Sequence, residues 1–215
     1  MMKIWCISDT HTKHRELTVP KGIDMVICAG DAGTTRSPAL NDSEMKDFLT
    51  WFSDIDAKHR LYVPGNHDTA VEHYYINQHD WPKVTFLIDE AITIDTVKIY
   101  GSPYTPTFGT GWAYNRDRNL LGAHWNVVPD DTDILVTHGP PHGILDVTSG
   151  MHHGDIDLTA CVKRVRPRYH IFGHFHNERG TINSMIYTEK GTTYVNASIV
   201  DLWHRVNNNG KIIGI

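Results

Sequence analysis

Five turns in this 215-residue sequence place histidines and carboxylates directly after short apolar runs. In chain order they read Asp9-x-His11, Gly30-Asp31, Gly65-Asn66-His67-Asp68, His138-Gly139 and Gly173-His174-x-His176. Carboxylate and amide oxygens, together with imidazole nitrogens, are the donors that a pair of divalent cations about 3.5–4 Å apart needs, with one carboxylate bridging the two ions. We therefore expect the five turns to form one metal site.

Each turn taken alone has a simpler explanation. An aspartate after a strand more often caps a turn than binds metal, and Asn66 follows Pro-Gly, which is typical of a turn. A lone histidine is more often solvated than a ligand. All five turns follow apolar runs, however, and together they contain a full ligand set for two metals. For the ligand pairs spaced by one residue we expect locally extended backbone, with the neighbouring glycines allowing tight turns.

The surrounding pattern predicts the elements that position these turns. Short apolar runs predict strands at residues 2–8, 24–29, 59–63, 133–137 and 169–172. Helical spacing predicts helices at 41–56, with Asn41 as N-cap, at 120–128, and after Asp155, where Leu158, Cys161, Val162 and Val165 share one face. We expect a β-meander of the second sheet at 84–100, another meander in the tail, and a long loop at 101–111.

Strands alternating with helices in both halves predict an α/β fold of two mixed β-sheets flanked by helices, with the catalytic loops at the carboxyl ends of strands. The length, 215 residues without a linker or repeat, fits a single domain over 1–215. We expect a cytoplasmic protein, because no apolar run approaches the roughly 20 residues of a membrane helix and the first residues carry no export signal. Three cysteines without metal-binding spacing are expected to be reduced core thiols.

The motif series DxH, GD, GNHD, HG and GHxH resembles that of the calcineurin-like metallophosphoesterases. The segments GSPYTP, WNVVPDDTDILVTHGPP, CVKRVRPRYHIFGHFHNERG and TTYVNAS are similar to the metallophosphoesterase-domain-containing branch, typified by brain-type phosphodiesterases, so the resemblance covers residues 1 to about 200. It implies a four-layer αββα sandwich. The sequence departs from the branch at Asn177 and in the segment AGTTRSP that follows Gly30-Asp31.

The resemblance also implies roles for single residues. Asp9, His11, Asp31 and His176 would hold one ion, and Asp31, Asn66, His138 and His174 the second, so that Asp31 bridges. His67 matches the catalytic histidine, and Asp68 matches the acidic residue that orients it. The cofactors would be two divalent transition-metal ions, manganese first, with iron, zinc, nickel or cobalt also compatible with mixed nitrogen and oxygen ligands.

The expected activity is hydrolysis of small phosphodiesters, 2′,3′-cyclic nucleoside monophosphates above all, by in-line attack of a hydroxide that bridges the ions. Trp112, Tyr114, Arg116 and His142 are candidate substrate contacts, although the aromatic residues would equally serve to cover a sheet edge. The net charge of −5 argues against a strong nucleic-acid-binding surface. A phosphomonoesterase, an exonuclease and a non-catalytic scaffold remain as alternatives, and the sequence does not indicate the oligomeric state.

Overall fold

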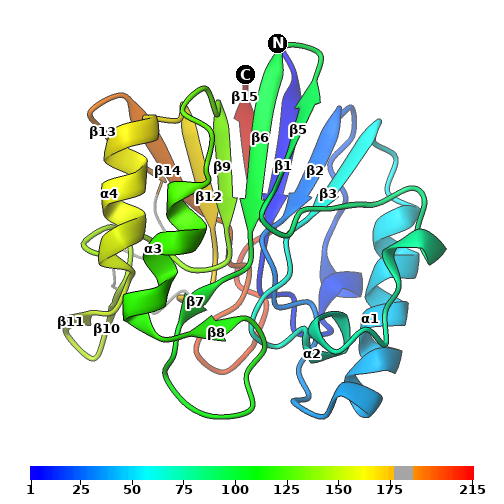
Figure 1. The fold of residues 1–215 in the computed structure, drawn as a ribbon. Helices are drawn as coiled ribbons and strands as arrows, with labels where there is room; N and C mark the ends of the chain where they lie inside the picture. The colour runs from blue at the N-terminus through cyan, green and yellow to red at the C-terminus, as the bar shows by residue number, and fades with distance from the viewer. Residues whose placement is uncertain (177–185) are drawn as a thin grey trace.

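The computed structural model describes residues 1–176 and 186–215, which form two large β-sheets packed face to face (Figure 1). In the first sheet β1 pairs antiparallel with β15, and the other neighbours are parallel. Its strands, in spatial order, are β15 (Lys211–Gly214), β1 (Lys3–Ile7), β2 (Met25–Cys28), β3 (His59–Tyr62) and β4 (Thr85–Phe86).

The second sheet has a parallel centre and one antiparallel strand at each edge. Its strands, in spatial order, are β13 (Ile186–Glu189), β14 (Thr192–Asn196), β12 (Tyr169–Phe172), β9 (Ile134–Thr137), β6 (Val97–Ser102) and β5 (Glu90–Ile94). Two short ladders join β7 (Thr105–Pro106) to β8 (Asn115–Arg116) and β10 (Val147–Thr148) to β11 (Met151–His152).

Helices cover the outer face of each sheet, which confirms the four-layer αββα sandwich (Figure 1). Helices α1 (Pro38–Ser53) and α2 (Thr69–Glu72) pack on the first sheet, and α3 (Arg118–Asn126) and α4 (Ile156–Val165) on the second. The 3₁₀ turns η1 (His14–Glu16) and η2 (Gln78–Asp80) complete the helical elements of the described residues. The predicted α4 face, Leu158, Cys161, Val162 and Val165, is buried, as expected.

Strand β1 shows why the apolar runs are continuous rather than alternating. Trp5 and Ile7 point toward helix α1, whereas Ile4 and Cys6 point into the layer between the sheets, and all four are fully buried. A strand with helices on one face and a second sheet on the other must be apolar on both. The three cysteines are buried free thiols, which confirms that prediction.

Three predictions about the elements were wrong. Helix α1 begins at Pro38 after the N-cap Ser37, because proline fits the first turn of a helix, so Asn41 is not the cap. The 84–100 segment divides between the sheets: β4 joins the first sheet beside β3, and β5 and β6 the second. In the tail, β15 likewise pairs with β1 of the first sheet. Short strand-like runs predict strands but not the sheet edge on which each one lies.

The 101–111 segment is also less loop-like than expected, because β6 continues to Ser102 and β7 forms inside it. Asn177, where the sequence departs from its relatives, lies outside the described residues. Within 1–176 and 186–215, no helix has the length and apolar character required to cross a membrane.

Candidate metal centre

The predicted ligands lie where strands end, and four of the seven have left-handed rather than extended backbone. Asp9, His11, Asp31 and His174 have φ values of 55°, 40°, 55° and 67°. The expectation of extended backbone at the paired ligands was therefore wrong. Left-handed backbone costs about 1–2 kcal/mol for a residue with a side chain, and surrounding structure must stabilise it. Here the amide N–H groups of Asp9 and His11 donate to the carbonyl oxygens of Gly30 (2.8 Å) and Asp31 (3.1 Å).

The glycines bring backbone and ligands into close approach, as predicted. A Cβ at Gly65 would lie 2.3 Å from Oδ1 of Asp31, and one at Gly173 would lie 2.4 Å from Oδ2 of Asp9. A Cβ at Gly30 would lie 2.7 Å from Nδ1 of His138. Real Cβ atoms do not approach this closely, so any larger residue would displace a ligand.

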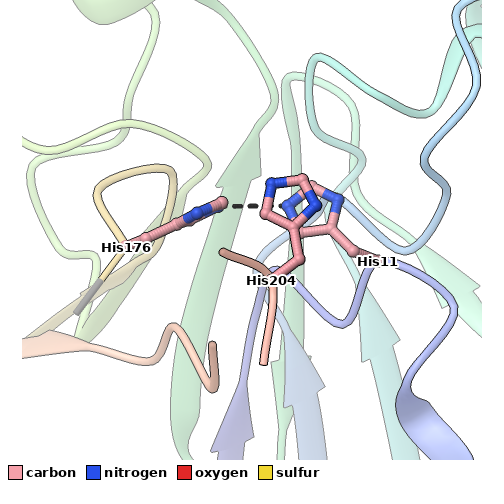
Figure 2. Close-up of side chains that lie close together, drawn as sticks. All are labelled: His11, His176 and His204. Carbon is pink, nitrogen blue, oxygen red and sulfur yellow. Dashed lines mark hydrogen bonds between the residues drawn. The ribbon is translucent and has the colours of Figure 1, made fainter. Parts of the chain in front are cut away.

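One group of ligand atoms gathers around the ends of β1 and β12. The Nε2 atoms of His11 and His176 face each other at 3.1 Å (Figure 2). Nε2 of His176 also lies 3.6 Å from Oδ1 of Asp9. Oδ2 of Asp31 lies 4.0 Å from Nε2 of His11. These four side chains are the set predicted for the first ion.

A second group lies on the other side of Asp31. Nε2 of His138 is 2.8 Å from Oδ1 of Asn66 and 3.3 Å from Oδ1 of Asp31. The ligand atoms of Asp31, His138 and His174 all lie within 4.8 Å of one another. Oδ1 of Asp31 thus faces the second group while Oδ2 faces the first, an arrangement that fits a carboxylate shared between two ions.

Hydrogen bonds orient two of the histidines for metal binding, and burial keeps two of them neutral. Nδ1 of His11 is bonded to the Gly33 carbonyl oxygen (3.0 Å) and Nδ1 of His138 to that of Ala29 (2.8 Å), so that Nε2 of each is directed into the site. Burial lowers the pKa of His11 to about 4 and that of His174 to about 3, so both are neutral at pH 7.

The buried carboxylates give the centre negative charge that favours the binding of cations. Burial acts to raise the pKa of Asp31, but His138 and His67 nearby outweigh it and hold that pKa well below its usual range. Burial likewise opposes protonation of His138, yet the Asp31 carboxylate raises the pKa of His138 to about 9. A buried carboxylate that is stabilised by a proton on an adjacent imidazole would also be stabilised by the positive charge of a metal ion. The donor set therefore fits two divalent cations.

His67 lies beside the two ligand groups, with its ring edge-on to His11 at 4.7 Å and to Trp112 at 4.6 Å. Its Nδ1 is bonded to the Thr34 carbonyl oxygen at 2.9 Å. Ligand atoms of His11, Asp31 and His67 lie within 4.8 Å of one another, so distance alone does not separate a ligand from a catalytic neighbour here. His67 is well placed for either role.

The orienting role predicted for Asp68 is wrong, because its carboxylate is directed at backbone instead of at the His67 ring. Oδ1 accepts hydrogen bonds from the N–H groups of Ala32 (2.9 Å) and Gly33 (3.0 Å), and Oδ2 from those of Asp31 (2.9 Å) and Gly65 (2.6 Å). Asp68 is fully buried. It joins the turn that carries Asp31 to the turn that carries Asn66, and so shapes the metal centre from behind.

The four candidate substrate contacts do not gather in one place. Trp112 lies against His67, and the Arg36 guanidinium lies 4.8 Å from the centroid of the Trp112 ring. Tyr114 is buried, and Arg116 lies within 3.4 Å of Glu72 and over the Tyr104 ring. His142 lines a different cavity, between α4 and the β13–β14 hairpin. Only Trp112 therefore remains next to the metal centre.

A cavity of about 320 Å³ opens beside His174 and His176. Its wall is mostly apolar, with Pro106 and Phe108 from one segment, Val147 from β10, and Leu202 from the turn before β15. Arg118, His153 and Phe175 also line it. The sequence does not predict this cavity, because its walls come from several segments that lie far apart in the chain.

His204 is the functional candidate that sequence reasoning missed. Its ring stacks on that of His11, with centroids 4.2 Å apart and planes 4° apart, and meets His176 edge-on at 5.0 Å (Figure 2). The ligand atoms of His11, His176 and His204 lie within 4.8 Å of one another. The sequence gives little indication of this role, because His204 follows Asp201-Leu202-Trp203 in a tail that carries none of the five motifs.

Comparison with known proteins agrees with this geometry. The sequence profile of the calcineurin-like phosphoesterases matches residues 2–178, and the chain belongs to that family of metal-dependent phosphoester hydrolases, which use divalent metal ions. It is 34% identical to UPF0046 protein K07C11.7 of Caenorhabditis elegans over 92% of this chain and 69% of the worm protein. It is 33% identical to the human metallophosphoesterase domain-containing protein 1 over 90% of this chain and 65% of the human protein.

Solved structures share the fold at low sequence identity. Phosphopantetheinyl hydrolase from Mycobacterium tuberculosis superposes with a TM-score of 0.61 at 16% identity, covering 94% of this chain and 90% of that one. TT1561 of Thermus thermophilus superposes with a TM-score of 0.62 at 14% identity, with the same coverage. These neighbours establish the fold alone.

Proposed function

We propose that the chain is a dinuclear metal-dependent phosphodiesterase acting on small phosphodiesters, most of all cyclic nucleotides, with 2′,3′-cyclic nucleoside monophosphates as the preferred class. The observation that carries the proposal is the position of Asp31, whose two oxygens face two different ligand groups. Two ions held there would supply a nucleophile from water near neutral pH and offset the negative charge of the phosphate.

The residues of the chain would do the rest. His67, held through Nδ1 by the Thr34 carbonyl oxygen, would protonate the leaving oxygen, a contribution of typically about 10²–10⁴-fold in rate. Trp112 also contacts the His67 ring, with centroids 4.6 Å apart, and this contact would limit its movement. We assign the metal ligands as predicted, with Asp9, His11 and His176 on one side of Asp31 and Asn66, His138 and His174 on the other.

The cavity beside His174 supports a small diester with one flat or apolar ester group. Its volume, about 320 Å³, lies at the low end of the range for small-molecule sites. Among its described lining residues, Arg118 is the permanently charged cation, and its guanidinium already donates to the carbonyl oxygens of His153 (2.9 Å) and Gly154 (3.1 Å). A monoester dianion would have a further charged oxygen to neutralise, so this lining favours a diester.

Domain organisation, cellular location and metal identity complete the proposal. We propose that residues 1–215 act as one metallophosphoesterase domain and that the protein works in the cytoplasm. Manganese is our first choice of metal, with iron, zinc, nickel and cobalt compatible with the same donors.

The test is an activity screen on protein freed of metal and reconstituted separately with Mn²⁺, Co²⁺ and Ni²⁺. The substrates are 2′,3′- and 3′,5′-cyclic nucleotides, bis-p-nitrophenyl phosphate, p-nitrophenyl phosphate and single-stranded DNA. We expect the 2′,3′-cyclic nucleotides to be hydrolysed fastest and Asp31→Asn to be inactive.

Three outcomes would contradict the proposal. Faster hydrolysis of p-nitrophenyl phosphate than of any diester would indicate a phosphomonoesterase, and preferential degradation of DNA an exonuclease. No hydrolysis of any phosphodiester with the three metals would leave a non-catalytic scaffold.

A further inference from the structure

His204 belongs to a turn that is built to hold it. The carbonyl oxygen of Asp201 accepts the His204 N–H at 2.9 Å. The Asp201 carboxylate accepts the N–H groups of Trp203 (2.9 Å) and Arg205 (3.0 Å) and also Nε of Arg205 (2.8 Å). His204 itself has left-handed backbone, with φ 55°. An ordered turn with a strained histidine at its tip is typical of functional positions.

The stacking geometry decides what His204 can do at the metal centre. An imidazole binds a metal through a lone pair that lies in the plane of its ring. The planes of His204 and His11 are nearly parallel and one ring lies above the other (Figure 2), so the in-plane lone pairs of the two rings are directed along separate, parallel planes and would not converge on one ion. His204 is therefore not a second ligand of the ion that His11 holds, although the distances alone would permit it.

The nitrogens of His204 nevertheless need a partner. Within residues 1–176 and 186–215, no side chain or backbone group makes a hydrogen bond to either ring nitrogen of His204. The ring is partly exposed, on the same turn as Leu202, which lines the cavity beside His174 and His176. His204 therefore contacts His11 and His176 from a turn that also contributes Leu202 to the cavity wall.

We propose that His204 is a phosphate-contacting residue, which donates a ring N–H to a phosphate oxygen of the substrate from the open side of the His11 and His176 pair. This inference rests on the proposed function and deepens it. Stacking on His11 fixes the plane of the His204 ring, so its donor is oriented before substrate arrives. His67 makes a T-shaped contact with the His11 ring, and His204 stacks on it. The bound phosphate would then have two histidine neighbours that are not metal ligands.

The experiment uses inorganic phosphate as the probe and four variants of the full chain. His204→Phe keeps a flat ring without a donor, His204→Gln keeps a donor without the ring, and His204→Ala removes both. Trp203→Ala, an exposed neighbour in the same turn, is the control for disturbance of the turn. Metal content is measured by elemental analysis, and phosphate binding to the metal-loaded protein by calorimetry.

We expect all variants to retain two ions per chain. His204→Phe and His204→Ala should bind phosphate about 10- to 100-fold more weakly, the range for a hydrogen bond to a charged group. His204→Gln should bind more tightly than His204→Phe, and Trp203→Ala should match the wild type.

Two results would overturn the inference. Wild-type phosphate affinity in His204→Phe would show that the ring only supports His11, and loss of an ion from His204→Phe would make His204 a ligand. Either result can occur while the wild type hydrolyses diesters, so failure of this inference is distinct from failure of the proposed function.

Discussion

Asp68 offers the sharpest test of how the metal centre is built. Its two carboxylate oxygens each accept two backbone N–H groups, from Ala32 and Gly33 on one side and from Asp31 and Gly65 on the other. In Asp68→Asn one oxygen becomes an NH₂ group, whichever way the amide turns. Two buried N–H donors then lose their acceptor and face another donor.

The cost follows from those two donors. A buried donor left without a partner costs about 1–3 kcal/mol, so two of them should lower the free energy of unfolding by about 4 kcal/mol. For a chain of this length that corresponds to a fall of about 8–16 °C in melting temperature. The affinity for metal should fall as well, because the Asp31 and Asn66 turns lose the group that joins them.

The assay is urea unfolding of the metal-free protein, followed by calorimetric titration with Mn²⁺. Asp146→Asn is the control, because Asp146 is also fully buried and lies away from the ligands: its Oδ2 accepts the N–H groups of Gly143 (3.0 Å) and Gly154 (2.9 Å), and its Oδ1 pairs with Nδ1 of His152, a charged contact that the amide would lose. It should lose stability yet keep its metal affinity. Unfolding of Asp68→Asn within about 0.5 kcal/mol of wild type, or equal metal affinity in the two variants, would refute this reasoning.

Three further predictions follow from single groups. His67→Ala should lower turnover about 10²–10⁴-fold while two ions stay bound; loss of an ion in elemental analysis would make His67 a ligand instead. His170 is fully buried with its Nε2 2.8 Å from Oγ1 of Thr137, and burial lowers its pKa to about 3. This folded-state pKa lies below the ordinary value of about 6.5, so as the pH falls the unfolded chain takes up a proton before the folded chain does. The stabilisation from neutral His170 is therefore full above about pH 6.5 and is lost as the pH falls toward 3. Between pH 7 and pH 5, urea unfolding should show wild type losing about 2 kcal/mol more than His170→Gln, and equal losses would contradict it. Burial raises the pKa values of the Cys6 and Cys28 thiols, so neither thiol should react with a thiol reagent until urea unfolds the protein. Rapid labelling of either cysteine in the native protein would contradict their placement in the core.

The sequence predicted the layers and the grouping of these side chains because both leave a direct pattern. A strand covered on two faces is apolar along its whole length, as in β1, and the five motifs fall at strand ends in a fixed order. Their meeting at one edge follows from the fold, so residues as far apart as Asp9 and His176 could be grouped from the order of the motifs alone.

Other features leave no such pattern. The side chain of Asp68 follows His67 directly in the sequence, yet backbone curvature directs it to four amides, and no residue type signals that direction. Tyr114 is an aromatic residue in an irregular segment, where no periodicity separates buried from exposed positions. His204 reaches the site through a turn between β14 and β15, and its position depends on the pairing of β15 with β1.

That pairing also bears on how the chain reaches its folded state. Lys3 pairs with Gly214 and Cys6 with Lys211, so this ladder closes nearly the whole length of the chain, the kind of contact that slows folding most. Until β15 arrives, β1 is the edge of the first sheet, with unpaired N–H and C=O groups along a strand of buried residues such as Trp5. An open edge of that kind readily recruits strands from other chains. We therefore expect docking of β15 to be a step at which correct folding competes with aggregation.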